Sequence, residues 1–526
     1  MANWVNSSVF YHIYPLGFCG APMLNAGGEP VNRIKKISEW IPHIKEGNFN
    51  ALYLGPVFES SVHGYDTKDY RVIDRRLGTN ADFKALCEEL HENGIKIVLD
   101  GVFNHVGRDF FAFKDLQENE YTSQYKDWFH VNFSGTSPYN DPFSYEGWQG
   151  HYNLVKLNIS NPEVADYILK SVEMWMDEFG IDGLRLDAAD CVDIEFFKKL
   201  RSFTKSKNPD FWLMGEIIHG DYTRWANNDV LDSVTNYECQ KGIYSSHNDK
   251  NYYEISYSLN RQFGNGGIYK NLTLYSFVDN HDVNRLASFL KRPEYLKNCY
   301  TLMYTMPGVP SVYYGSEWGI KGERTSASDA VLRPSLDLDN IPDADMDLFN
   351  HIKELGRLHA ELLPVQVGDY ENILIRNEQL VFKRSCASGA VYVALNLSDH
   401  NAEVGFNITG ACLVDRLAGD KQYIPQNNYI SINMPPFSSM ILEEGNAAKV
   451  APQVEEQGIL IGRMYKHFKG NTYIVLAIGK NSETMEDVVI YQEPAGEKKV
   501  WVRPLSMFSE EIERDGRKFK RFTLID

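Results

Sequence analysis

Long apolar runs are missing from the 526-residue chain, and no stretch approaches the roughly 20 consecutive apolar residues that a membrane-spanning helix needs. The first ten residues also lack a basic region followed by an apolar one, so no secretory signal is predicted. Together these absences predict a protein that stays in the cytoplasm and has no role in a membrane.

Cysteine is scarce and irregularly placed. The chain has seven cysteines, an odd number, and none of them shows the paired spacing of a metal site. We therefore expect buried, reduced thiols, and we predict no metal site.

Positive charge is also in short supply, with 53 Lys and Arg against 71 Asp and Glu and a net charge of −18. Such a surface repels phosphate backbones, so no nucleic-acid partner is predicted. What the chain does have is 43% hydrophobic and 13% aromatic residues, enough for a large core in more than one domain. This composition favours an enzyme or binding protein with a neutral or cationic ligand.

Residues 1–362 alternate short apolar runs with amphipathic segments. Ile34, Ile37, Ile41 and Ile44 recur at helical spacing before Gly47, for example. Eight strands are expected, at Val9–Leu16, Ala51–Leu54, Ile95–Leu99, Ile181–Leu186, Phe211–Met214 and in the runs that end at Asn236, Asp279 and Gly315. This alternation predicts an α/β protein with a (β/α)8 TIM barrel.

The remaining segments differ in pattern from the barrel. Residues 104–155 are rich in aromatic residues, Gly and Asn without a clear period, which predicts an inserted irregular domain B after the third strand. Residues 363–446 show short alternating runs and predict an antiparallel β-sandwich domain C. Residues 447–457 read as a linker, and residues 458–526 as a small β-rich domain.

Four acidic residues stand where predicted barrel strands end: Asp100, Asp187, Glu216 and Asp282. One such acid is as often the N-cap of the following helix. Four of them at the end of the barrel that carries active sites favour paired-carboxylate chemistry, such as cleavage of a glycosidic bond in a neutral sugar.

The segments around these acids carry a family resemblance. Asp100-Gly-Val-Phe-Asn-His105, Gly183-Leu-Arg-Leu-Asp-Ala-Ala189, Gly215-Glu216 and Phe277-Val-Asp-Asn-His-Asp282 resemble, in order and spacing, the four regions that define the α-amylase family, glycoside hydrolase family 13. The resemblance covers about residues 5 to 445. It implies the barrel, the inserted domain and the sandwich behind them.

The resemblance also implies roles for the catalytic residues. Asp187 is similar to the family's nucleophile, Glu216 to its general acid/base, and Asp282 to the carboxylate that stabilises the oxocarbenium-like transition state. In a retaining reaction Glu216 must be protonated, with a raised pKa, and Asp187 ionised, which Arg185 would favour. Similar positions hold the sugar in the family: Tyr65, Asp100, His105, Arg185 and His281. Each of these taken alone is more often a packing or surface residue.

Other features resemble the neopullulanase, cyclomaltodextrinase and maltogenic amylase group. Val155-Lys-Leu-Asn158 matches its short motif, in which Lys156 reaches sugars on the leaving-group side, and Gly215-Glu-Ile-Ile-His219 matches its segment after the acid. Asp329 and Arg333 are similar to the pair that grips the next sugar towards the non-reducing end. The group usually has Trp where this chain has Ile218, which puts in doubt the binding of cyclic substrates and transfer to sugar acceptors. The group also usually has an N-terminal β-domain, whereas the first predicted barrel strand starts near Val9 here, so we expect a more open cleft.

The resemblance therefore predicts a retaining hydrolase of α-1,4 bonds in maltooligosaccharides and related α-glucans. Two alternatives are a transglycosylase or isomerase acting on short α-glucosides, and a catalytically silent sugar-binding relative. No cofactor is predicted to be required. The family commonly binds Ca²⁺ through an Asn at the position of Asn104, but the second motif here ends in Ala189-Asp-Cys191, and a calcium site is not predicted.

The C-terminal segment from Tyr465-Lys-His-Phe-Lys-Gly470 to Trp501-Val-Arg-Pro504 resembles a small bacterial domain of unknown function. Its aromatic residues are either its core or a carbohydrate-binding platform: Tyr465, Phe468, Tyr473 and Trp501. A unit of this size needs most of its aromatic side chains inside, which favours the core.

Overall fold

The computed structural model describes residues 4–325, 328–445, 455–456, 459–460, 463–493, 499–514 and 517–525. The chain divides into two compact units. One comprises Met1–Asn407, Val414–Tyr423 and Tyr429–Glu444, and the other Ile408–Leu413, Ile424–Asn428 and Gly445–Asp526. Within the described ranges, no helix has the length and apolar character needed to cross a membrane.

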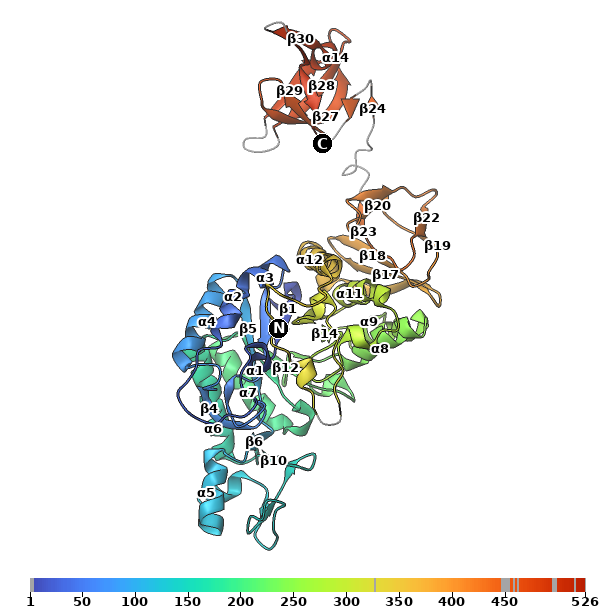
Figure 1. Cartoon of the computed structure of the whole chain (residues 1–526). Coiled ribbons are helices and arrows are strands. Elements are labelled where there is room, and N and C mark those ends of the chain that lie inside the picture. Colours follow the sequence, from blue (N-terminus) through green and yellow to red (C-terminus); the bar gives the residue numbers. More distant parts are fainter. Residues whose placement is uncertain are drawn as a thin grey trace. The chain divides into compact units, whose positions relative to one another are not determined.

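Eight parallel strands form the centre of the first unit (Figure 1). Their order in the sheet is β13-β12-β11-β5-β2-β1-β15-β14, and a parallel bridge from Thr235 to Tyr275 joins the two ends into a barrel. The strands are β1 (Phe10–Ile13), β2 (Ala51–Leu54), β5 (Lys96–Gly101), β11 (Gly183–Leu186), β12 (Trp212–Gly215), β13 (Ser233–Val234), β14 (Tyr275–Phe277) and β15 (Val309–Tyr313). The predicted barrel fold is confirmed.

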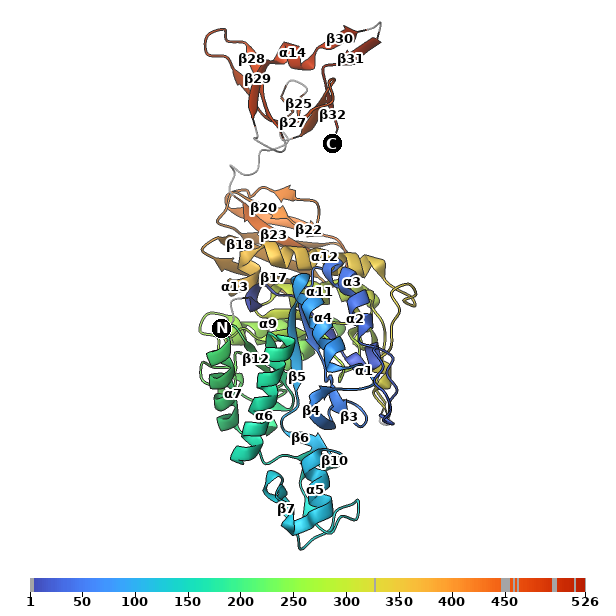
Figure 2. The same ribbon diagram turned by 90° about the vertical axis from the view of Figure 1, so that its left-hand side faces the viewer.

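Helices surround this barrel (Figure 2). The longer ones are α4 (Asn80–Glu92), α6 (Pro162–Met174), α7 (Ile194–Lys207), α8 (Tyr237–Asn248), α9 (Tyr252–Phe263), α11 (Leu296–Thr305) and α12 (Met346–Glu361). A π-helical turn, η4 (Trp175–Phe179), continues α6 and ends at Gly180, whose φ of 68° suits a residue without a side chain.

Proline corrects two sequence predictions. The first strand was expected to run to Leu16 but ends at Ile13, because Pro15 begins helix α1 (Pro15–Phe18). The single helix expected from Ile34 to Ile44 is two helices, α2 (Lys35–Glu39) and α3 (Ile41–Glu46). Pro42 lacks the N–H that an interior helical position requires, so it lies in the first turn of the second helix.

The segment between β5 and α6 projects from one end of the barrel (Figures 1 and 2). It contains β6 (His105–Gly107), α5 (Phe111–Asn119), two short strands β7 (Val131–Asn132) and β8 (Ser144–Tyr145), then β9 (Gly147–Trp148) and β10 (His151–Lys156). Helix α5 was not expected in this irregular segment. It forms because Ala112, Phe113 and Leu116 recur at helical spacing and are buried.

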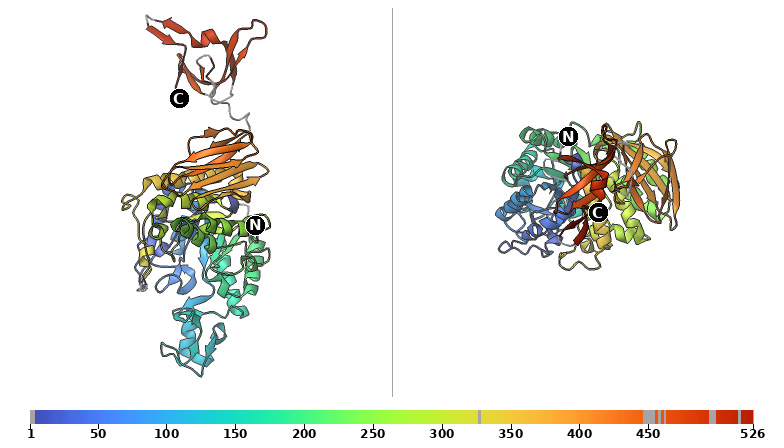
Figure 3. Two further views of the ribbon diagram at one scale, coloured as in Figure 1. Left: turned by 90° about the vertical axis from the view of Figure 1, so that its right-hand side faces the viewer. Right: turned by 90° about the horizontal axis from the view of Figure 1, so that it is seen from above.

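Antiparallel sheets follow the barrel (Figure 3). Six strands are ordered β16-β17-β18-β23-β20-β21, and β19 pairs separately with β22. Their bounds are β16 (Asp369–Ile375), β17 (Gln379–Cys386), β18 (Gly389–Asn396), β19 (Ala402–Asn407), β20 (Cys412–Asp415), β21 (Lys421–Tyr423), β22 (Tyr429–Met434) and β23 (Ser439–Gly445). Buried Arg384 donates to the carbonyls of Gly368 and Thr305, at 2.9 and 2.7 Å, which ties this sheet to helix α11.

The second unit contains a five-stranded sheet with the order β29-β28-β27-β26-β32. Its strands are β26 (Met464–His467), β27 (Thr472–Lys480), β28 (Asp487–Gln492), β29 (Val500–Pro504) and β32 (Phe522–Leu524), with helix α14 (Leu505–Ser509) and the hairpin β30 (Glu511–Arg514) and β31 (Arg517–Lys520). The single strand expected at Lys518–Ile525 is thus two. Of the predicted linker, only 455–456 lies among the described residues, in strand β24 (Glu455–Glu456).

Candidate active site

Three predicted catalytic carboxylates follow the barrel strands β11, β12 and β14. Asp187 comes directly after β11, Glu216 directly after β12, and Asp282 five residues after β14. Because the strands are parallel, these positions lie at one end of the barrel. All three side chains line one cavity of about 770 Å³.

Arg185 joins the carboxylates beneath that cavity. Its Nη1 atom lies 2.9 Å from Asp187 Oδ1 and 2.8 Å from Asp100 Oδ1, and its Nη2 atom lies 2.8 Å from Glu216 Oε2. One buried guanidinium thus faces three carboxyl groups, and full ionisation of all three would leave buried negative charge without a partner. This cluster of three carboxyl groups is therefore suited to hold a proton on one of its members.

The electrostatics of Asp187 differ from the sequence expectation. Burial raises the pKa of its carboxyl, the Arg185 guanidinium opposes this rise, and the charges of Glu216, Asp100 and Asp282 add to it. The expected effect of Arg185 is present, but burial beside three other acids outweighs it. Among these groups, Arg185 is therefore the one that favours the ionised nucleophile that catalysis needs.

Glu216 is held by two donors besides Arg185. The backbone N–H of Ala188 donates to its Oε2 atom at 3.1 Å, and the Tyr237 hydroxyl donates to its Oε1 atom at 3.4 Å. Asn280 in turn donates to the Tyr237 hydroxyl at 3.1 Å. Ala188 has a φ of 42°, an uncommon value for a residue with a side chain, and this backbone turn aims its N–H at the carboxylate.

Asp282 lies between two basic groups. Its Oδ2 atom is 3.0 Å from His281 Nε2, and its Oδ1 atom is 3.1 Å from an Arg333 Nη2 atom that also pairs with Asp329 at 2.7 Å. Burial alone would raise the pKa of Asp282, but His281 and Arg333 together lower it well below its ordinary value. Asp282 is therefore the carboxylate that stays ionised beside the cavity.

Aromatic rings complete the lining of the larger cavity. Tyr65 donates to Asp100 Oδ2 at 3.0 Å and bonds to His281 Nε2, and the Tyr65 and His281 rings stack with centroids 5.6 Å apart. His105 lies 5.5 Å from the Trp148 ring, and its Nε2 atom is buried without a hydrogen-bond partner among the described residues. Burial lowers the pKa of His105 to about 3, so its imidazole is neutral and able to accept or donate a hydrogen bond to a sugar hydroxyl.

This geometry can be compared with known proteins. Residues 13–347 match the family model described as alpha amylase, catalytic domain. The chain belongs to the α-amylase family. As a member of this family it is a glycoside hydrolase, and the alternative of a catalytically silent relative is set aside.

Relatives of this α-amylase family member are named for action on α-glucans. Neopullulanase 2 of Thermoactinomyces vulgaris is 31% identical over 84% of the chain and 78% of its own length. An intracellular maltogenic amylase of Bacillus subtilis is 32% identical over 61% of the chain and 57% of its own length. A solved cyclomaltodextrinase superposes with a TM-score of 0.76 at 25% identity, covering 84% of this chain and 79% of that one. Residues 463–524 match a second model, described as a protein of unknown function (DUF1653).

Apart from Lys156, the predicted sugar-site residues of this glycoside hydrolase fall into three places. Those that line the larger cavity are Tyr65, His105, Asp329 and Arg333. Asp100, Arg185 and His281 lie buried beneath it and position the others. His219 is exposed and lines neither cavity described here, so its role stays a prediction.

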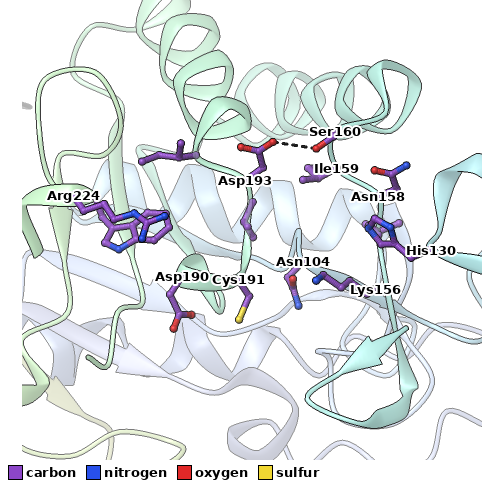
Figure 4. Close-up of a pocket in the computed structure, with 14 residues that line it drawn as sticks. Asn104, His130, Lys156, Asn158, Ile159, Ser160, Asp190, Cys191, Asp193 and Arg224 are labelled. Atoms are coloured by element: carbon purple, nitrogen blue, oxygen red, sulfur yellow. Dashed lines mark hydrogen bonds between the residues drawn. The ribbon is translucent and has the colours of Figure 1, made fainter. Parts of the chain in front are cut away.

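Lys156 lines a smaller cavity of about 340 Å³ that shares Asp190 with the larger one. Figure 4 shows Lys156 beside Asn104 in this cavity, and Lys156 also pairs with Glu146 at 3.6 Å. An ammonium group next to Asn104 does not suit a divalent cation. Across the described residues, no group of three His, Cys, Asp or Glu side chains is placed to hold a metal ion.

Sequence reasoning missed several residues of the larger cavity. Tyr237, Trp148 and Arg324 line it, and Arg324 Nη1 donates to the carbonyl of Asp282 at 3.1 Å. Tyr237 comes directly after Asn236, where a barrel strand was predicted to end, so its position beside that strand was available from the sequence. Trp148 lies in the short strand β9 and Arg324 outside any helix or strand, and no local sequence pattern indicates how either segment folds.

Proposed function

We propose that this enzyme hydrolyses α-1,4-glucosidic bonds in maltooligosaccharides and related α-glucans with retention of configuration. The arrangement that supports this most is the Arg185 guanidinium shared between Asp187 and Glu216, at 2.9 and 2.8 Å. Two carboxylates on one guanidinium are close together. A short spacing of about 5–5.5 Å suits a nucleophile paired with an acid, whereas an inverting enzyme leaves more room for a water.

In this reaction Asp187 attacks the anomeric carbon while Glu216 gives its proton to the leaving oxygen, so the bond to the leaving sugar breaks as the glycosyl bond to Asp187 forms. Glu216 then takes a proton from a water molecule as the water oxygen bonds to the anomeric carbon and the bond from that carbon to Asp187 breaks, which releases the sugar and restores both carboxyl groups. Asp282, held ionised by His281 and Arg333, stabilises the positive charge on the sugar ring. The Tyr65 ring, which stacks on His281, packs against the sugar in the cavity.

The substrate class rests on the relatives. They are named neopullulanase, maltogenic amylase and cyclomaltodextrinase, and one of them is named intracellular. We accordingly propose oligosaccharides inside the cell as substrates. The exposed Ile218 on the wall of the cavity offers no flat ring for a second sugar, which favours water over sugar acceptors in the competing transfer reaction.

Parallel incubations with maltoheptaose, β-cyclodextrin and pullulan test this proposal. Proton NMR of the first product should show the α-anomer, and size separation should show shorter maltooligosaccharides. A first product in the β-configuration would contradict retention, and a predominance of longer or rearranged products would favour the transferase or isomerase alternative.

A substitution tests the assignment of the nucleophile. Asp187→Asn should lower kcat roughly 10³-fold or more, because the amide cannot form the covalent intermediate. Asp166→Asn, which removes an acid from an exposed pair with Lys170, is the matched control and should keep normal activity. Ordinary turnover by Asp187→Asn would remove the assignment.

A further inference from the structure

The small domain formed by residues 458–526, called the C-terminal unit below, differs in charge from the rest of the molecule. Residues 458–526 contain 12 Lys and Arg against 10 Asp and Glu, whereas the whole chain has a net charge of −18. The aromatic core expected there is confirmed only in part. Tyr465 is buried, but Trp501 keeps 46% of its surface exposed.

Trp501 belongs to β29, the outer strand of the five-stranded sheet (Figure 2). Its neighbours Val500 and Val502 are 55% and 63% exposed, so three consecutive large apolar side chains face solvent on this strand. Exposed apolar outer strands readily pair with another chain, and proteins usually avoid or cover them.

The register shows which backbone groups point outward. Strand β29 pairs with β28 in antiparallel fashion, with Val502 opposite Ile490 and Trp501 opposite Tyr491. The Lys499 carbonyl accepts from the Glu493 N–H at 3.2 Å, so Lys499 and the alternate residues Trp501 and Arg503 turn their backbone groups towards β28. Val500 and Val502 therefore turn theirs to the outer edge. By the same alternation Pro504 faces the outer edge, so its lack of an N–H removes no hydrogen bond to β28.

The side chains along this edge also alternate. Lys499, Trp501 and Arg503 lie on one face of the strand, and Val500 and Val502 on the other. Arg503 donates to the Tyr491 hydroxyl at 3.2 Å and covers the Phe522 ring at 5.6 Å, which fixes its guanidinium. In the part of the chain that the structure describes, no acidic side chain pairs with Arg503.

We propose that the outer edge of β29 binds an extended acidic peptide segment of a partner protein as an added sheet strand. The outward groups of Val500 and Val502 supply backbone hydrogen bonds, the two valines pack against apolar residues, and Arg503 pairs with an acid of the peptide. A second copy of this chain fits poorly. Two β29 strands paired around Trp501 would place Lys499 opposite Arg503, and like charges in that position are destabilising.

The acetylated and amidated pentapeptide Glu-Val-Tyr-Val-Glu matches this edge residue by residue. It places acids opposite Lys499 and Arg503, valines opposite Val500 and Val502, and a ring opposite Trp501. Fluorescence anisotropy of a labelled form with the full-length protein should give a Kd below about 1 mM. The Lys-Val-Tyr-Val-Lys peptide, and the acidic peptide methylated on its valine nitrogens, should bind at least about tenfold more weakly.

Protein variants distinguish strand addition through backbone hydrogen bonds from non-specific hydrophobic binding. Val502→Pro removes one outward N–H, is tolerated on an outer strand, and should weaken binding about tenfold or more. Val502→Thr keeps that N–H and should stay within about twofold. If Val502→Pro fails to fold by circular dichroism, Lys499→Glu/Arg503→Glu should instead prefer the Lys-containing peptide.

Three results would overturn the proposal: no binding of the acidic peptide at 1 mM, equal binding of the methylated peptide, or unchanged charge preference in the double variant. Sedimentation analysis without peptide tests the other occupant. A concentration-dependent dimer that Val502→Pro abolishes would assign this edge to a second copy of the chain instead.

Discussion

At the scale of single residues, the support of Glu216 is the feature most open to test. Tyr237→Phe removes the hydroxyl that donates to Glu216 at 3.4 Å but keeps the ring. We expect kcat on maltoheptaose to fall about tenfold, because a lost hydrogen bond to a carboxyl group costs about 1.5 kcal/mol. KM should change less, since the hydroxyl acts on Glu216. Tyr257→Phe, at a tyrosine that is 69% exposed, is the control. An unchanged kcat would show that Arg185 and Ala188 suffice.

The same scale shows what sequence can supply. Asp187, Glu216 and Asp282 could be proposed because each follows a strand within a recognisable motif, and the barrel brings them to one cavity. The proton balance around Arg185 could not be proposed in this form. It depends on burial and on distances between groups on four strands, and burial beside other acids raises the pKa of Asp187, although the sequence predicted only that Arg185 would favour its ionised form. Tyr237 has no motif around it, and only the folded barrel shows that it reaches Glu216.

At the scale of elements, strong periodicity and capping residues predicted the barrel helices and strands well. The failures came where one residue or a distant partner decides: Pro15 and Pro42 set element ends, and helix α5 was hidden among aromatic residues. Strand β6 depends on a distant partner in the same way. A Cβ atom on Gly107 would lie 2.6 Å from the carbonyl oxygen of Asp66, so only glycine allows this close approach.

Gly107→Ala should therefore displace β6, and with it His105 two residues earlier on the same strand. We expect a loss of about 1–3 kcal/mol in the free energy of unfolding, measured by urea denaturation, together with a raised KM for maltooligosaccharides. Gly479→Ala is the matched control, because its Cβ would meet the Ile490 side chain at an ordinary 3.7 Å. Equal stability of the two variants would show that the Asp66 backbone can shift enough to make room for the added methyl group.

At the scale of the whole molecule, buried histidines make stability depend on pH. Burial lowers the pKa of His105 to about 3 and those of His247 and His359 to about 4. An unfolded chain binds protons on these groups below about pH 6.5, and the folded chain does not, so stability falls as pH falls. The three groups together should cost roughly 4 kcal/mol per pH unit between pH 6 and 4. Calorimetry should show a steep fall of Tm between pH 6 and 4. His247→Gln should make this fall less steep. A Tm that does not change with pH in this range would contradict the burial of neutral histidines.

The division into two units leads to the last expectation. Every residue that lines the larger cavity belongs to the first unit, and the C-terminal unit has a core of its own in Tyr465, Val475, Val489, Tyr491, Phe508 and Phe522. A chain that ends after Gly445 keeps β23 complete and removes no side chain of the catalytic cavity. Its kcat/KM on maltoheptaose should stay within about twofold of the full chain, since cavity and catalytic groups are unchanged. It should also lose all binding of the acidic peptide. A folded but inactive product would show that the C-terminal unit takes part in catalysis.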